Sequence, residues 1–545
     1  MKRISSILAA LAVLIALAVP VSAQVPVTPV PPGKIVAQQA TPIFNVIYYF
    51  VPSPTTGAYN PTAPLIQGTD GSLYGTTEYG GANGYGIAFK ITTNGVLTVL
   101  HNFCSQTFTE DGLVYCLDGG LPYAPLLQAA DGNLYGTTMG GGNGINGGDG
   151  TVFRLTPSGG YTLLYDFCQV NGCPDGGGPM AGLVQDANGT LYGASQSTIY
   201  DITTDGVFSL IWSDIQGNDN GTQGFVAAMT PGTDGLLYGT ATGDGLNSGT
   251  FFGIALDGTR EEYYPFCSVL DPPGCTPGTA GCICQDGMQP YSTLVQGRDG
   301  YMYGTTQGGG LYGQGAIFKI DREGCRGLLL CEETVLYSFC SQYNGTTCLD
   351  GADPQSGLTL GSDGNFYGVT AMNGPGPEEG EIFRITPEGT FTVLHGFDGV
   401  HGAYPVGALV QATDGNFYGT TEGDGYGANV IFSLSVGLPP FVKTLPTAGN
   451  VGETVRILGT NLIGATKVLF NGHAAAFKVA SSSLITAVVP NGATTGPVEV
   501  VTPGSTLLSN VPFQILTPGI FPVGLLPGPS PPAPSLPEPS LPPAA

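Results

Sequence analysis

Carboxylate side chains recur at one position of the sequence where they could bind a ligand. Five Asp residues each stand directly before a glycine, in segments that follow the last predicted strand of a repeated unit. A carboxylate accepts hydrogen bonds from sugar hydroxyls or pairs with a cationic group, and the glycine allows close approach to the backbone. The alternative is a structural turn, in which each carboxylate caps its own backbone. The candidate ligand-binding residues are Asp118, Asp175, Asp286, Asp350 and Asp398.

Other side chains lack the spacing that catalysis or metal binding requires. The four His residues form no metal-ligand pair, and no Cys–His or Gly-x-Ser-x-Gly arrangement occurs. The repeated Asp-Gly pairs lack the ligand density of a calcium loop. Neither run of three glycines, at 140–142 and 308–310, is followed by the Lys-Ser/Thr of a phosphate-binding loop. We therefore expect no catalytic residue, no metal and no cofactor, and favour a binding protein over an enzyme.

The N-terminus has the pattern of an export signal. Lys2 and Arg3 precede an apolar run from Ile7 to Val19, and small residues end at Ala23. This order predicts a signal peptide over residues 1–23, and no later segment is apolar for long enough to span a bilayer. We expect a protein that is secreted to the extracellular space or cell surface, with the periplasm as an alternative.

Twelve cysteines in an exported chain indicate disulfides. Their short spacings predict the local pairs Cys104–Cys116, Cys168–Cys173, Cys325–Cys331 and Cys340–Cys348. The other four cysteines allow three pairings, of which a bridge between Cys282 and Cys284 is disfavoured because so short a ring is strained. A zinc site in the same group is a weaker alternative, since no His lies nearby. These four residues are Cys267, Cys275, Cys282 and Cys284.

The composition narrows the classes of fold and partner. Of 545 residues, 88 are Gly and 44 are Pro, and only 10% are charged, which disfavours long helices and coiled coils. The formal net charge of −25 argues against nucleic acid or an anionic membrane surface as a partner. An extracellular glycan or surface protein is the expected partner, and we expect the chain to be a monomer.

A repeated motif predicts the architecture that positions the candidate residues. The string (D/N)-G-x-(L/M/F)-Y-G occurs seven times, within units of four short strands joined by hairpin turns. Seven such units predict a seven-bladed β-propeller, an all-β fold, over residues 43–436. The seventh unit lacks its fourth strand, and an orphan strand at residues 43–50 is expected to complete it and close the ring. The motifs begin at Asp70, Asp131, Asn188, Asp234, Asp299, Asp363 and Asp414.

Other repeated residues have structural interpretations. The Tyr of each motif recurs at one strand position and predicts core packing, with the following Gly giving room for the neighbouring blade. Gln residues three positions before the motif are expected to hydrogen-bond backbone between blades. His101 and His395 fall where other repeats have Tyr, which predicts a packing role. The Gln residues are Gln67, Gln128, Gln185, Gln296 and Gln411.

The units resemble the GloVer-type tandem repeat of exported bacterial proteins, and the resemblance covers roughly residues 43–436. It rests on the D-G-x-L-Y-G-T-T string, the Gly-rich turn and the following apolar strand runs, and it implies no established catalytic residue. Residues 441–516 alternate short strands with turns such as Asn471-Gly472, and resemble an IPT/TIG domain, a small immunoglobulin-like β-sandwich. Residues 24–42 form a Pro-rich linker, and the Pro-rich segment 517–545 is expected to be a disordered tail without a core.

These features predict an exported, non-catalytic binding or scaffold protein, which recognises an extracellular glycan or protein. The longer connections share one predicted face of the propeller and carry the candidate Asp residues, and variable loops on a rigid scaffold are the usual place for binding. One alternative is a polysaccharide-active hydrolase or lyase that uses two loop carboxylates. The other is a purely structural component of the envelope.

Overall fold

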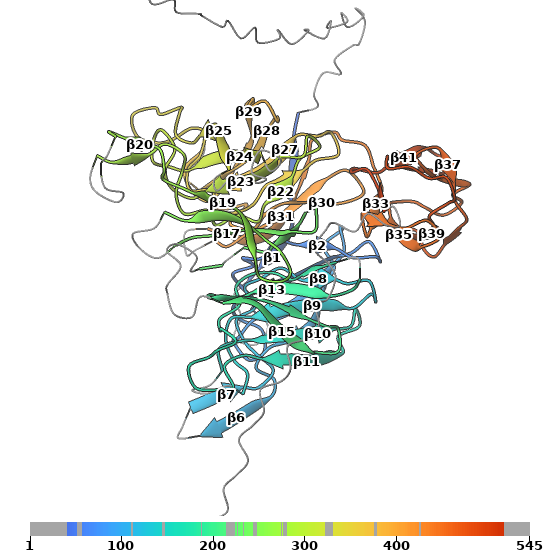
Figure 1. The fold of residues 1–545 in the computed structure, drawn as a ribbon, viewed down its shortest axis with the longest axis horizontal. Coiled ribbons are helices and arrows are strands. Elements are labelled where there is room, and N and C mark those ends of the chain that lie inside the picture. Colours follow the sequence, from blue (N-terminus) through green and yellow to red (C-terminus); the bar gives the residue numbers. More distant parts are fainter. Residues whose placement is uncertain are drawn as a thin grey trace, which may run out of the picture. The chain divides into compact units, whose positions relative to one another are not determined.

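The computed structural model describes residues 41–51, 57–110, 113–143, 148–186, 188–213, 224–225, 227–232, 234–243, 248–273, 275, 281–321, 331–374, 379–423 and 427–516. Within these ranges the secondary structure is strand and turn without helix, so the predicted all-β class is confirmed (Figure 1). No helix in the described part of the chain has the length and apolar character needed to cross a membrane. The predicted signal peptide, residues 24–40 of the linker and the tail lie outside the described residues.

Each of the seven repeated motifs lies in its own four-stranded antiparallel sheet within the described residues. We number them repeat sheets 1 to 7. Sheet 1 is β2 (Ile66–Gln67), β3 (Leu73–Thr77), β4 (Ile87–Ile91) and β5 (Leu97–Asn102); sheet 2 is β8 (Leu127–Gln128), β9 (Leu134–Thr138), β10 (Thr151–Leu155) and β11 (Tyr161–Asp166); sheet 3 is β12 (Val184–Gln185), β13 (Leu191–Ala194), β14 (Thr198–Ile202) and β15 (Phe208–Ser213). Sheet 4 is β16 (Thr230–Pro231), β17 (Leu237–Ala241), β18 (Thr250–Ile254) and β19 (Arg260–Pro265); sheet 5 is β22 (Val295–Gln296), β23 (Met302–Thr306), β24 (Ala316–Asp321) and β25 (Glu332–Ser338); sheet 6 is β26 (Thr359–Leu360), β27 (Phe366–Thr370), β28 (Glu381–Ile385) and β29 (Phe391–Gly396).

Repeat sheet 7 is completed by the N-terminal strand. It contains β30 (Val410–Gln411), β31 (Phe417–Thr421) and β32 (Asn429–Ser435), and its fourth strand is β1 (Ile43–Phe50). The antiparallel register runs from Ile43 opposite Ser435 to Phe50 opposite Asn429. The predicted pairing of the orphan strand with the last repeat is therefore confirmed, and β1 forms the outer strand of repeat sheet 7, which joins the N-terminal end of the repeat array to its last repeat.

The core lies in and between these sheets. The second strand of each repeat sheet is fully buried, and rings pack between neighbours, with Tyr303 and Phe366 centroids 4.1 Å apart. The predicted core role of the motif Tyr is confirmed, but the reason for the following Gly is different. A Cβ on Gly75 would lie 2.7 Å from Leu65 and 2.8 Å from Phe89, which both belong to its own repeat. The glycine thus makes room for its own sheet rather than for the neighbouring one.

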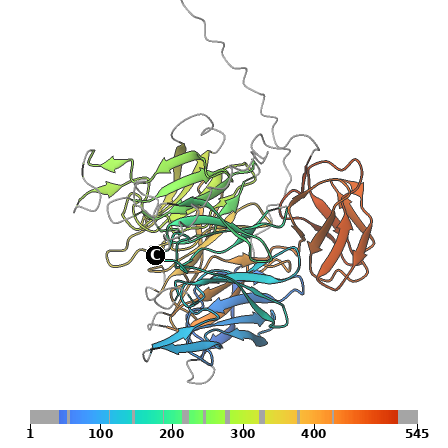
Figure 2. The same cartoon turned by 60° about the horizontal axis from the view of Figure 1, so that its bottom comes forward.

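A β-sandwich follows the seven repeat sheets, and Figure 2 shows its two facing sheets in orange-red. Its core is aliphatic and aromatic, with Val455, Ile457 and Phe470 almost completely buried. The predicted hairpin turn is present, since Asn471 and Gly472 both have positive φ, at 45° and 83°. One sheet is β33 (Lys443–Leu445), β35 (Thr454–Leu458), β39 (Leu484–Val488) and β38 (Phe477–Val479); the other is β37 (His473–Ala474), β36 (Lys467–Phe470), β40 (Val498–Val501) and β41 (Thr506–Leu508); β34 (Ala448–Gly449) and β42 (Gln514–Ile515) form a parallel pair.

Candidate functional site

The connections between repeat sheets are held by disulfides. Three predicted pairs are confirmed: Cys104–Cys116, Cys168–Cys173 and Cys340–Cys348. The open pairing is resolved as Cys267–Cys284 and Cys275–Cys282. Cys331 is disulfide-bonded, but Cys325 lies outside the described residues, so that predicted pair stays a prediction. Five disulfides within the described residues point to an oxidising compartment outside the cytosol.

In four of these connections, the backbone adopts the same conformation directly after the fourth strand. The first cysteine of each has positive φ, at 59° for Cys104, 62° for Cys168, 61° for Cys267 and 67° for Cys340. Two of the connections contain a short hairpin of their own, β6 (Thr107–Glu110) with β7 (Leu113–Cys116) and β20 (Leu270–Asp271) with β21 (Ile283–Cys284). These four loops therefore begin with the same backbone turn at a disulfide-bonded cysteine.

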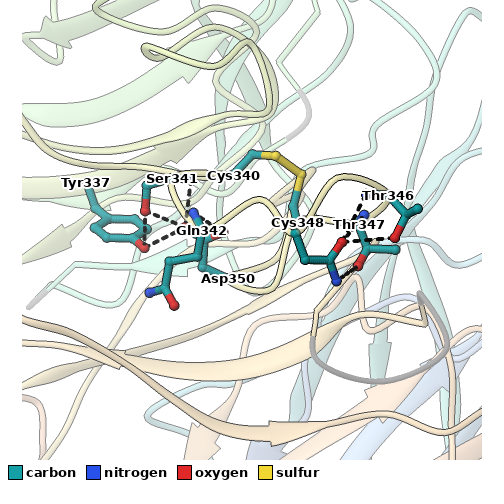
Figure 3. Close-up of a disulfide and its surroundings, with 9 residues drawn as sticks. Tyr337, Cys340, Ser341, Gln342, Thr346, Thr347, Cys348 and Asp350 are labelled. Atoms are coloured by element: carbon teal, nitrogen blue, oxygen red, sulfur yellow. Dashed lines mark hydrogen bonds between the residues drawn. A yellow bond between two sulfur atoms is a disulfide. The ribbon is translucent and has the colours of Figure 1, made fainter.

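Asp350 shows how a candidate carboxylate fits into such a loop (Figure 3). Its side chain is completely buried, and its Oδ2 accepts hydrogen bonds from the Tyr337 hydroxyl at 2.6 Å and from the Ser341 hydroxyl at 2.6 Å. The backbone N–H groups of Ser341 and Gln342 donate to the two carboxylate oxygens at 2.9 and 3.2 Å. The carboxylate thus joins the end of β25 to the disulfide loop that follows it.

Asp118, Asp175 and Asp286 have the same arrangement. Asp286 is 2% exposed and accepts from the hydroxyls of Tyr264 and Ser268 and from the backbone of Ser268 and Val269. Asp175 accepts from the Tyr165 hydroxyl and the Cys168 backbone. Burial raises the pKa of Asp118, but hydrogen bonds involving His101 and Ser105 outweigh it and hold the pKa below its usual value. In these four residues the geometry matches the structural turn that the sequence also allowed.

Asp398 differs from the other four candidates. It follows repeat sheet 6 in a connection where no cysteine stands at the equivalent position, and its side chain is 50% exposed. It accepts from the backbone of Val400 and His401, and its Oδ2 lies 2.7 Å from His401 Nδ1. Direct ligand contact by the five Asp residues stays a prediction; Asp398 is half exposed and Asp175 is partly exposed, while the other three are buried.

Aromatic rings join neighbouring repeat sheets beside these loops. The residue at the end of one fourth strand stacks on a ring at the start of the next fourth strand: His101 on Tyr161, Tyr165 on Phe208, Tyr337 on Phe391 and His395 on Phe44, with centroids 3.8–4.2 Å apart. The predicted packing role of the two His residues is therefore confirmed. At two junctions the stacked Tyr also donates to the loop carboxylate, Tyr165 to Asp175 and Tyr337 to Asp350, so stacking and loop are directly linked there.

Four of the five repeated Gln residues connect neighbouring sheets, as predicted, while Gln296 donates to Gly300 of its own repeat. The backbone N–H of Thr69 donates to Gln128 Oε1 at 2.8 Å, and that of Ala130 donates to Gln185 Oε1 at 2.7 Å. The N–H of Thr413 in repeat sheet 7 donates in the same way to Gln67 of repeat sheet 1. This last bond joins the two ends of the repeat array.

A small cavity marks the axis on which the repeats converge. Its volume is about 110 Å³, and it is lined by residues that stand just before the innermost strand of every repeat sheet. Ligand pockets are typically about 300–1,000 Å³, so this cavity is too small for an ordinary organic ligand. The residues that represent the seven repeats are Thr62, Tyr123, Met180, Ala228, Tyr291, Gln355 and Val406.

The connections between sheets lie beside the Gly-rich loops that join second and third strands. Isolated bridges pair Gly120 with Gly140, Met288 with Gly308 and Ala352 with Met372. We call the surface formed by these two sets of loops the loop-rich face. It exposes large apolar side chains, including Tyr312 at 51% and Tyr343 at 61%. The others with substantial exposure are Tyr85, Phe108, Val114, Val170, Val269, Leu311 and Val400.

The repeats and the sandwich together define a β-propeller protein with a C-terminal immunoglobulin-like domain. The Gloeobacter/Verrucomicrobia repeat family matches residues 33–198, 118–281 and 279–456, which together exceed half of the chain. The chain therefore belongs to the Gloeobacter/Verrucomicrobia repeat family. An IPT/TIG domain matches residues 440–515, so both predicted resemblances are confirmed.

Two solved structures of bacterial proteins are similar to this chain. One is titled as the extracellular domain of the hybrid two-component system BT3049 from B. thetaiotaomicron, with 11% identity and a TM-score of 0.44 over 87% of this chain and 58% of that chain. The other is PorZ, a surface component of the type-IX secretion system of Porphyromonas gingivalis, with 13% identity and a TM-score of 0.44 over 86% and 61%. The chain thus spans about three fifths of the length of each. None of the curated proteins matches it significantly.

Proposed function

We propose that this protein is an exported, non-catalytic recognition protein that binds an extracellular glycan or surface protein through the loop-rich face. The observation that carries this proposal is the exposure of aromatic and aliphatic side chains on loops that are held rigid. Isolated exposed apolar residues need no explanation, but several on one loop surface are typical of an interaction site. Tyrosine suits such a surface because it offers a large contact area and a hydroxyl at little cost in side-chain entropy.

The buried carboxylates support this function by positioning the loops. Asp118, Asp286 and Asp350 tie each loop to the end of a strand, and a disulfide closes the same loop. A loop that is already ordered loses less conformational entropy when a ligand binds, so affinity improves. The half-exposed carboxylate of Asp398 is the candidate for direct contact with a hydroxyl or a cationic group of the partner.

The alternative function of a hydrolase or lyase needs two accessible carboxyl groups on either side of the reacting bond. Asp118, Asp286 and Asp350 are at most 2% exposed, and their oxygens already accept bonds from their own loops. A carboxylate in this state is poorly placed to act as a nucleophile or base. The geometry of these three residues therefore supports a role in holding the loops rather than in catalysis.

A glycan array and a panel of purified surface proteins test the proposal, with reducing-sugar release measured in parallel. We expect a partner to be bound without release of sugar. Tyr312→Ala and Tyr343→Ala should weaken that binding at least tenfold. Val96→Ala and Val207→Ala are matched controls, because these valines are 60% and 64% exposed on short turns between third and fourth strands. Equal losses from both pairs of variants, or sugar release, would contradict the proposal.

A further inference from the structure

A groove runs along the outer strand of repeat sheet 5. It has a volume of about 410 Å³ and lies between β25 and the connection from repeat sheet 4. Asp286 and Val269 line it from the connection, and Glu333 and Val335 line it from β25. The exposed side chain of Tyr312 gives it an aromatic wall. Its size is within the range of ligand pockets.

Glu333 occupies a position where repeat sheets 2, 3, 6 and 7 have an aromatic ring, while repeat sheet 1 has Leu97 and repeat sheet 4 has Arg260. It pairs with Ile320, the last apolar residue of its neighbouring strand, as Tyr161 pairs with Leu155 and Phe391 pairs with Ile385. In repeat sheets 2, 3, 6 and 7 this ring stacks on a Tyr or His of the preceding sheet. At the junction of sheets 4 and 5, Tyr264 faces a carboxyl group instead, and among the described residues no ring stacks on it.

The carboxyl group of Glu333 is an unused acceptor. Its Oε1 is buried and has no hydrogen-bond partner among the described residues. Burial, and in second place the charge of Asp286, raises the pKa of Glu333 to about 8. An aliphatic or aromatic residue would fill this position without such a cost, so the carboxyl group has a poor structural explanation.

The groups around Glu333 favour an organic cation that pairs with a single carboxylate over a metal ion that requires several ligands. None of the described residues that line the groove is Lys or Arg, while Asp286 adds a second negative charge. The Asp286 oxygens already accept four hydrogen bonds, so they are not free to ligate a divalent ion, which requires several oxygen ligands. An ammonium group needs only hydrogen-bond acceptors and attractive charge, and a carbon skeleton attached to it can contact Tyr312 and Val335.

We propose that this groove binds a primary ammonium group carried on a carbon skeleton, with the Glu333 carboxylate as its direct partner. The inference deepens the proposed function and rests on it, because amino sugars and lysine side chains are the extracellular sources of such a group. Among the described residues, the other titratable groups that line the groove or contact Glu333 are Asp286 and the phenols of Tyr264, Tyr312 and Tyr337. Burial raises the pKa of the Tyr264 and Tyr337 phenols well above the usual value, so these two remain neutral.

Binding must be accompanied by loss of a proton from Glu333. At neutral pH the raised pKa keeps most of this carboxyl group protonated, and an ammonium ion pairs with the ionised form. The proton passes to the buffer, and no other bond is made or broken. Affinity should therefore increase as the pH rises toward 8, while the ammonium group of lysine, with a pKa of about 10.4, stays charged.

Isothermal titration calorimetry of the full exported chain tests this proposal. The probes are Nα-acetyl-lysine amide, with its Nε-acetylated form as the neutral control, and glucosamine at pH 7, with N-acetylglucosamine as its control. We expect both ammonium compounds to bind and both neutral controls to fail. Titration in two buffers of different ionisation enthalpy should show proton release, and the lysine probe should bind about tenfold or more weakly at pH 6 than at pH 8.5. The tighter of the two ammonium probes identifies the source.

Three variants test whether the ammonium probes bind at Glu333 rather than elsewhere on the chain. Glu333→Gln should weaken binding of the ammonium probes at least tenfold and abolish proton release. Glu333→Phe introduces the ring that repeat sheets 2, 3, 6 and 7 have at this position, and it should also abolish binding while leaving the fold intact. Asp166→Asn, in the equivalent groove of repeat sheet 2, should have no effect. Equal binding of neutral and ammonium probes, or unchanged binding by Glu333→Gln, would overturn the ammonium site. If the ammonium probes bind but no glycan or protein does, the proposed function fails and this site stands.

Discussion

Replacing Asp350 with alanine distinguishes a loop-positioning carboxylate from a ligand-binding one. The substitution removes a completely buried acceptor and leaves the N–H groups of Ser341 and Gln342 without it. Each hydrogen bond to a charged group contributes about 1.5–3 kcal/mol, and such bonds in one network do not add fully. The Tyr337 and Ser341 hydroxyls can still bond to each other, since they lie 2.8 Å apart. We therefore expect the free energy of unfolding to fall by about 3–5 kcal/mol.

Urea unfolding followed by tryptophan fluorescence measures this change. The chain has one Trp, Trp212, which packs on Phe225 with centroids 5.7 Å apart, so the signal reports on the repeat sheets and not on the sandwich. Asp398→Ala is the matched control, because a half-exposed carboxylate should change the free energy of unfolding by less than about 1 kcal/mol. If Asp350→Ala unfolds at the same urea concentration as Asp398→Ala, the positioning role is wrong and direct binding by Asp350 becomes the better explanation.

Three further predictions follow from the sheet junctions and from buried ionisable groups. Deleting residues 43–50 should lower the urea midpoint of the Trp212 transition, while the sandwich keeps its dispersed methyl signals in NMR spectra; an unchanged midpoint would contradict closure by β1. The pKa of Glu333 is raised from 4.5 to about 8, so its contribution to stability is complete below pH 4.5 and is lost as the pH rises to 8. Glu333→Gln should therefore lose less stability over that range, and a parallel pH profile would refute this. Burial lowers the pKa of His395, so stability should decline as the pH falls below about 6.5; His395→Phe, which keeps a ring against Phe44, should reduce that decline in thermal melts.

Much of the fold could be predicted because the same motif occurs in every repeat, so that the strands of one repeat indicate the strands of the others. The recurring Tyr motif located the sheets, and the missing strand of the last repeat identified β1 as its replacement. Short spacings were enough for Cys104–Cys116, but not for the group of four cysteines, whose pairing depends on the hairpin of β20 and β21.

The role of the candidate Asp residues depends on contacts that sequence order does not reveal. The donors to Asp286 come from residues 17 to 22 positions earlier, which reach it only because the disulfide loop folds back on its strand. In the third repeat the motif carries Asn188, yet the Tyr192 hydroxyl donates to Asp186 two residues earlier. The sequence does carry a signal for Glu333, because alignment of the fourth strands places a carboxyl group where four other repeats have an aromatic ring.

Closure of the ring by β1 also sets the order in which the chain can fold. Its partner β32 follows roughly 390 residues later, so β1 has no partner until the seventh repeat has been synthesised. Bringing ends this far apart together costs about 3 kcal/mol more in chain entropy than closing a ten-residue loop. The disulfide loops, with separations of 5 to 17 residues, close over far shorter stretches of chain. The local loops can therefore form before the array is complete, which makes β1 the last strand of the repeat sheets to find its partner.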